Sequence, residues 1–123
     1  MNELDDIGIG IDLVEINRFK ERPYNTNKSF YKKIFLEEEI DYCLKFSDSY
    51  RHFAGKFALK EALIKSIKKK IEFSAILTSH LDLKPEIKIE RNYGEYNFRA
   101  SLSHETDFAI AIVISKKIDY IST

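Results

Sequence analysis

The spacing of hydrophobic residues predicts a strand first and helices after it. Residues 7–11 alternate isoleucine with glycine, which is typical of a strand that another element approaches closely on one face. We expect this strand to end at Asp12 and a helix to follow over residues 13–19, with Leu13, Ile16 and Phe19 toward the core.

Three more helices are predicted in the first half of the chain. Two short ones cover residues 29–35 and 37–46, and the second opens with three glutamates, which the helix dipole favours at that end. The longest periodic segment runs from 50 to about 69, after a possible N-cap at Asp48 or Ser49. Its apolar side and its small residues predict burial against a sheet; they are Phe53, Ala54, Phe57, Ala58, Ala62, Leu63, Ile64 and Ile67.

The second half of the chain changes to the alternation that is typical of strands. Four strands are predicted over residues 74–78, 86–91, 96–102 and 108–115. Residues 92–94 predict a hairpin turn between the second and third of these. We therefore expect an α+β fold in a single domain over residues 1–123, with the long helix packed on an antiparallel sheet.

The composition supports a folded domain and argues against a nucleic-acid partner. Hydrophobic residues make up 44% of the chain, which is enough for a core. Twenty basic residues balance twenty acidic ones, whereas proteins that bind nucleic acid without sequence preference usually carry a basic excess. We therefore expect no nucleic-acid partner, although the lysines over residues 65–70 leave that alternative open.

The single cysteine and the first residues bear on location. Cys43 has no second cysteine to pair with, and we expect it to be a small buried hydrophobic residue. Residues 1–6 are acidic, unlike the start of a secretory signal. The apolar run over residues 7–16 contains two acids and is too short to span a membrane. We expect a cytoplasmic protein.

Three local features carry candidate chemistry, and each also has an ordinary structural explanation. Asp12 follows the glycine-bearing strand, where an aspartate is commonly a turn former or helix cap. Glu61 and Lys65 are one helical turn apart and would also suit a surface ion pair. His104 ends a predicted strand, where a lone histidine is commonly structural.

Taken together and in order, these features resemble the holo-acyl-carrier-protein synthase family of 4'-phosphopantetheinyl transferases. The resemblance extends over nearly the whole chain. Its motifs are residues 8–18, residues 53–62 followed by Lys65, and residues 101–104 with the closing strand 108–114; residues 30–35 match a weaker family segment.

The resemblance implies an enzyme that moves the phosphopantetheine arm of coenzyme A onto a serine of an apo acyl carrier protein. Charge on the pyrophosphate makes cations central to such a reaction. The family pattern makes Asp12 and Glu61 the ligands of Mg²⁺, and it makes Glu61 and Lys65 catalytic. Lys60, Lys65 and His104 become candidate contacts for coenzyme A.

The resemblance also implies protein partners. Acyl carrier proteins are acidic, and the family binds them through basic residues near its first helix. Arg18 matches the first motif, and Arg22, Lys32 and Lys33 are further candidates, with solvated surface cations as the alternative. The short bacterial enzymes are homotrimers, so we expect a homotrimer here.

Two departures from the family pattern leave an alternative open. Residues 66–70 replace a glycine-rich turn, so that Lys68, Lys69 and Lys70 either contact phosphate or are simply solvated. Lys56 stands where relatives commonly have arginine, which loses bidentate phosphate geometry. The alternative function is a non-catalytic module that binds coenzyme A or a carrier protein.

Overall fold

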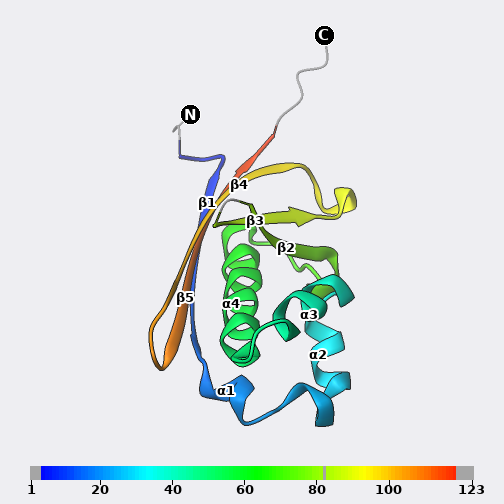
Figure 1. Ribbon diagram of the computed structural model, residues 1–123. Coiled ribbons are helices and arrows are strands. Elements are labelled where there is room, and N and C mark those ends of the chain that lie inside the picture. Colours follow the sequence, from blue (N-terminus) through cyan, green and yellow to red (C-terminus); the bar gives the residue numbers. More distant parts are fainter. Residues whose placement is uncertain (1–3, 82, 119–123) are drawn as a thin grey trace.

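The computed structural model describes residues 4–81 and 83–118 (Figure 1). The α-helices are α1 (Asn17–Lys20), α2 (Lys28–Ile34), α3 (Glu37–Leu44) and α4 (Ser49–Ile67). The strands are β1 (Ile7–Glu15), β2 (Ile76–Leu81), β3 (Lys84–Ile89), β4 (Tyr96–His104) and β5 (Phe108–Lys117). Single 3₁₀ turns are η1 (Tyr24–Thr26), η2 (Phe73–Ala75) and η3 (Arg91–Tyr93).

Helix α4 is the centre of the molecule. Figure 1 shows it lying along a three-stranded antiparallel sheet of order β1-β5-β4, with α2 and α3 on its other side. Strands β2 and β3 form a separate two-stranded sheet near the C-terminal end of α4. The predicted α+β class, with a long helix on an antiparallel sheet, is confirmed.

Two glycines let the backbone of β1 touch the backbone of α4. A Cβ atom added to Gly10 would lie 1.9 Å from the Ala62 carbonyl oxygen, and one added to Gly8 would lie 1.7 Å from the Ser66 carbonyl oxygen. No side chain fits into either gap, so each position requires glycine for steric reasons. The close approach that the alternating glycines predicted is therefore present.

An aromatic cluster fixes the short helices against α4. Tyr31 and Phe53 are fully buried, with their ring centroids 4.6 Å apart in an edge-on arrangement. Phe19 and Phe35 pack around the same pair. The Tyr31 hydroxyl donates to the Arg22 carbonyl at 2.6 Å, and burial raises the pKa of this hydroxyl to about 12. The cluster connects α1 and α2 to the central helix.

The predicted end of the first strand is wrong. Strand β1 continues through Asp12 to Glu15, and α1 is only four residues long. Leu13 therefore lies on the outward face of the sheet and is 58% exposed, whereas Ile16 and Phe19 are buried as expected. The alternating pattern extends past Asp12, and a two-residue period places Leu13 on the same face as Ile11.

The predicted hairpin turn at residues 92–94 is also wrong. Strands β3 and β4, which it joins, belong to different sheets and form no ladder with each other. The segment contains η3 and ends at Gly94, whose positive φ of 108° favours glycine. Consecutive strands instead pair as hairpins where β2 meets β3 and where β4 meets β5. Within the described residues, no helix is long and apolar enough to cross a membrane.

Candidate active site

Asp12 lies inside β1 on the face that meets α4. It shares this face with Gly10 and pairs with Ala111 of β5. Its side chain is 15% exposed, so the carboxylate has limited contact with water. Because β1 is an edge strand, this carboxylate lies where the open edge of the sheet meets α4.

Lys65 reaches from α4 to the same edge of the sheet. Its Nζ atom lies 3.0 Å from Asp12 Oδ1 and donates at 3.1 Å to the Ile11 carbonyl oxygen. The Lys65 side chain is 53% exposed, so its ammonium is still open to solvent. The structure therefore brings together the first and second predicted motifs.

Glu61 lies one helical turn before Lys65 and is half-buried. Burial raises the pKa of Glu61, and the nearby Asp12 carboxylate raises it further, while Lys65 and Arg18 act in the opposite direction. Two carboxylates that repel each other electrostatically can be stabilised by a divalent cation bound between them. Mg²⁺ commonly takes one or two carboxylates and fills its shell with water and phosphate oxygens, so this donor pair fits it.

Arg18 extends the site toward the short helices. It projects from α1, and its guanidinium lies 5.0 Å from the ring centroid of Phe57, one turn before Glu61 on α4. Arg22 similarly lies 4.9 Å from the Phe30 ring, and Lys33 is exposed on α2. Of these three predicted partner-binding cations, Arg18 is the one whose charge acts on Glu61.

The structure places Lys60, a predicted contact for coenzyme A, inside the protein. Its side chain is fully buried against α2, α3 and η2. Its ammonium donates to Glu39 Oε1 at 2.6 Å, to the Ile34 carbonyl at 2.8 Å and to the Phe73 carbonyl at 3.1 Å. These three bonds use all its protons, so no donor is left for a ligand.

His104 lines a pocket that does not include Asp12, Glu61 or Lys65. That pocket is lined by Asp48, Arg51, His52 and His104, at the N-terminal end of α4. Burial lowers the pKa of His104, and its Nε2 atom is buried without a hydrogen-bond partner against Gly55. Its predicted contact with coenzyme A stays a prediction.

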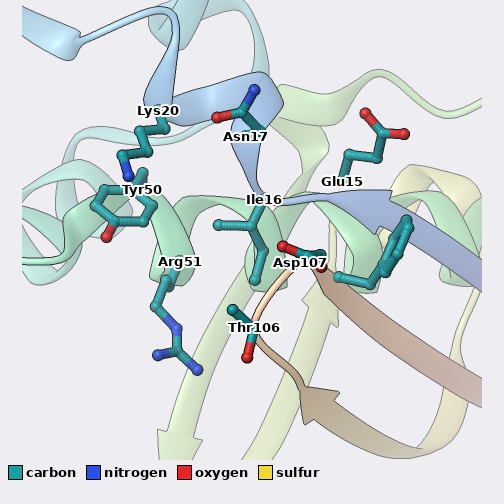
Figure 2. A pocket seen from close by; sticks show the side chains of 9 residues that line it. Glu15, Ile16, Asn17, Lys20, Tyr50, Arg51, Thr106 and Asp107 are labelled. Atoms are coloured by element: carbon teal, nitrogen blue, oxygen red, sulfur yellow. The ribbon is translucent and has the colours of Figure 1, made fainter.

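A larger pocket of about 580 Å³ adjoins this region (Figure 2). Arg51 lines both pockets, and Figure 2 shows Lys20 directed toward Tyr50, with its ammonium 5.5 Å from the ring centroid. The sequence analysis missed this pocket because α1, the start of α4 and the turn after β4 each supply isolated residues without a motif. The lining residues are Glu15, Ile16, Asn17, Lys20, Tyr50, Arg51, Thr106, Asp107 and Phe108.

The residues that depart from the family pattern have structural roles. Lys68 caps the C-terminal end of α4 in the left-handed region, with φ of 55°. Lys69 donates to the Tyr93 carbonyl at 3.0 Å. Lys56 is buried, and its ammonium donates to the carbonyl and hydroxyl oxygens of Thr78.

Comparison with known proteins identifies the family. The model of the 4'-phosphopantetheinyl transferase superfamily matches residues 8–113. A holo-[acyl-carrier-protein] synthase of Ehrlichia ruminantium is 39% identical over 119 residues, which cover 90% of this chain and 97% of the relative.

Solved structures agree with this match. A holo-(acyl-carrier-protein) synthase of Bacillus anthracis, solved in complex with CoA (3',5'-ADP), superposes with a TM-score of 0.77 at 29% identity, over 90% of this chain and 96% of that one. The Helicobacter pylori synthase, solved with coenzyme A, gives 0.76 at 32% identity, over 88% and 99%. The chain therefore belongs to the 4'-phosphopantetheinyl transferase superfamily and is an enzyme of its holo-[acyl-carrier-protein] synthase group.

Proposed function

We propose that this chain transfers 4'-phosphopantetheine from coenzyme A to a serine of an apo acyl carrier protein. The serine oxygen forms a bond to the phosphorus of the pantetheine phosphate. The bond from that phosphorus to the bridging oxygen breaks, and adenosine 3',5'-bisphosphate leaves with this oxygen. The proposal depends above all on the juxtaposition of Asp12, Glu61 and Lys65 at one edge of the sheet. Relatives solved with coenzyme A support the choice of donor.

Asp12 and Glu61 are the proposed ligands of Mg²⁺. Among the residues that the structure describes, no group of three or more His, Cys, Asp or Glu is arranged to hold a metal ion. A site with two carboxylates leaves coordination positions for phosphate oxygens, as transfer from a pyrophosphate requires. When bound, Mg²⁺ would neutralise charge on the pyrophosphate.

Lys65 is the proposed stabiliser of the leaving group. Its ammonium lies 3.0 Å from Asp12 Oδ1, and half of its side chain faces solvent. A flexible lysine at this position can turn from Asp12 toward a phosphate oxygen without disturbing the core. It would then balance the negative charge that grows on the leaving bisphosphate.

Glu61 is the proposed acceptor of the serine proton. Its pKa is raised by burial and by Asp12, which makes its carboxylate a better base than an ordinary solvated glutamate. Lys65 and Arg18 act in the opposite direction and favour the ionised form of this carboxylate. This role is compatible with metal binding because a carboxylate has two oxygens.

The acidic carrier protein is proposed to dock beside α1 and α2. Arg18 on α1, Arg22 in the segment that follows it and Lys33 on α2 are all exposed, and Lys32 is a further exposed cation on α2. The guanidinium of Arg18 lies over the ring of Phe57, which is one helical turn before Glu61, so a carrier held there would have its serine close to the site.

The outward face of the three-stranded sheet is proposed to contact further copies of this chain in a homotrimer. On β1, Ile9, Ile11 and Leu13 are 63%, 60% and 58% exposed. On β5, Ile110 and Ile114 continue the same face at 40% and 41%. An apolar face of this kind is a common interaction surface, and it is unsuited to an acidic carrier. A second copy offers the matching apolar surface.

Intact-mass spectrometry of an apo acyl carrier protein tests the proposal. The carrier is incubated with the enzyme, coenzyme A and Mg²⁺, and we expect a mass gain of one phosphopantetheine group that a chelator prevents. Apo carrier incubated with coenzyme A alone is the control. No mass gain with a fatty-acid carrier and several specialised carriers would contradict transfer and favour the non-catalytic binding module.

A further inference from the structure

A buried polar cluster lies on the side of α4 that faces α2 and α3, away from the sheet. Its members are Glu39, Lys56, Lys60 and Thr78, and each is at most 2% exposed. They come from α3, α4 and β2, so the cluster connects three elements that are far apart in the sequence.

Glu39 is the hub of this cluster. Its Oε1 atom accepts hydrogen bonds from the Leu36 amide at 2.8 Å and from Lys60 at 2.6 Å. Its Oε2 atom accepts from the Thr78 amide at 3.0 Å and from the Thr78 hydroxyl at 2.5 Å. Both oxygens therefore have two donors each, which satisfies the carboxylate fully.

Lys60 couples this hub to the central helix. Its ammonium is held by acceptors from three different segments: the end of α2, Glu39 of α3 and the turn η2. Such a pair adds little to stability compared with apolar side chains of equal size, because desolvation offsets the attraction between the charges. Hydrogen bonds with fixed lengths and directions do, however, restrict how α4 can rotate or slide.

The next residue along α4 is Glu61. Its carboxylate and the Lys65 ammonium reach the sheet side of the helix, where Asp12 lies on β1. A small rotation of α4 would carry both side chains away from Asp12. Displacements of about 1 Å can lower a rate by roughly a hundredfold when the reaction depends on geometry.

We infer that Glu39 and Lys60 are positioning residues, which fix the rotation of α4 so that Glu61 and Asp12 hold one cation between them. The inference rests on the proposed function for its catalytic consequence. The structural part of the inference does not depend on that function: Glu39 holds Lys60, and Lys60 is the neighbour of Glu61 on α4.

The test uses Mn²⁺ as a spectroscopic probe of the carboxylate pair. Free Mn²⁺ is measured by electron paramagnetic resonance during titration of the full chain, without substrates. The variants are Glu39→Leu/Lys60→Met, which removes both charges together, and Lys56→Met as the matched control. Lys56 lies one turn earlier on α4 and is equally buried, but its ammonium bonds to Thr78 rather than to Glu39. Circular dichroism fixes a temperature at which all the variants are folded.

We expect the double variant to bind Mn²⁺ at least about tenfold more weakly and to lose at least about tenfold in kcat, with the KM for coenzyme A within about twofold. Lys56→Met should keep Mn²⁺ affinity within about twofold of the unchanged chain. Equal losses in the two variants, or unchanged Mn²⁺ affinity in the double variant, would overturn the inference. If the double variant does not fold, Glu39→Gln decides instead: weaker Mn²⁺ binding supports positioning, and unchanged binding overturns it.

These measurements distinguish a failure of the proposed transfer activity from a failure of the positioning role. An unchanged chain that binds Mn²⁺ but transfers nothing contradicts the proposed function, and the Mn²⁺ titrations of the variants still decide on positioning. An unchanged chain that transfers the group while the double variant binds Mn²⁺ normally contradicts positioning alone. An unchanged chain that binds no Mn²⁺ overturns both the cation site and the positioning inference.

Discussion

The Lys65 ammonium lies 3.0 Å from the Asp12 carboxylate, although 53 positions separate the two residues in the chain. Half of the Lys65 side chain is exposed, so water screens the pair and its contribution to folding is small. An ion pair that adds little stability and unites two sequence motifs points to a role in chemistry. Several predictions depend on this arrangement or on the surfaces around it.

Lys65→Met should separate activity from stability. We expect the free energy of unfolding to change by less than about 1 kcal/mol, because the Lys65 ammonium is open to solvent. Transfer should slow by about a hundredfold or more, because a cation aimed at the leaving group is lost. Intact-mass kinetics and urea unfolding measure the two effects. Lys45→Met, an exposed lysine at the end of α3, is the matched control and should alter neither.

The pH dependence of the rate should report the ionisation of the Glu61 carboxyl group. Its pKa is raised above the ordinary value of 4.5, so kcat should fall at a higher pH than an ordinary glutamate would require as the solution is acidified. Raising the pH should increase kcat but decrease the contribution of Glu61 to folding stability. The folded state holds this proton more tightly than the unfolded state, so Glu61 lowers stability as pH rises from 4.5 through its folded pKa.

Glu61→Gln is the companion variant for this pH profile. Transfer should be abolished with the fold intact, because an amide neither accepts the proton nor carries charge for the cation. Glu72→Gln, which alters an exposed glutamate after α4, should leave both rate and pH profile unchanged. Normal turnover by Glu61→Gln would remove Glu61 from the mechanism.

Arg18→Glu should weaken use of the carrier. We expect a rise in the KM for the carrier and a residual rate that depends less on ionic strength, because an attractive charge is replaced by a repulsive one. Initial rates at several salt concentrations measure this. Lys88→Glu, the same reversal on exposed β3, serves as the control. An unchanged KM for Arg18→Glu would contradict docking at α1.

Ile11→Glu should disrupt assembly. The side chain is 60% exposed in one chain, so a glutamate is tolerated by the monomer fold but repels a second apolar face. Light scattering after size-exclusion chromatography should show trimer for the unchanged chain and monomer for the variant. Leu44→Glu alters an exposed leucine on α3 and should remain trimeric. A monomeric unchanged chain would refute the homotrimer.

Lys68→Gly should stabilise the protein. Lys68 holds a left-handed φ of 55° at the end of α4, a conformation that costs a non-glycine residue about 1 kcal/mol. Glycine removes this cost, so the midpoint of thermal unfolding should rise. Lys68→Ala removes the same charge but keeps the strain, and its midpoint should stay close to that of the unchanged chain.

The sequence predicted most of the fold because its periodicities are strong. The long helix and the glycine-bearing strand have unambiguous patterns, and both lie where they were expected. The boundary at Asp12 was misplaced because an aspartate commonly ends a strand, yet here its side chain is accommodated beside α4. The false hairpin at residues 92–94 arose because turn residues do not reveal which strands pair.

The candidate site was predicted in part, and Lys60 shows why. Glu61 and Lys60 are neighbours in one motif, but successive residues on a helix point in different directions. The Lys60 ammonium donates all its hydrogen bonds inside the protein because α2, α3 and η2 place acceptors around it, and the sequence does not reveal those positions. The pocket around Arg51 was invisible for a similar reason, since its lining comes from separate segments.

The contact of Gly8 and Gly10 with α4 has a consequence for redesigning this enzyme. Because β1 and α4 touch through backbone atoms, the spacing between the strand that bears Asp12 and the helix that bears Glu61 is set by main-chain dimensions. Side chains of the aromatic cluster do not enter that contact. Mutational libraries aimed at thermal tolerance can therefore vary the aromatic cluster, while both glycines, Glu39 and Lys60 are kept unchanged.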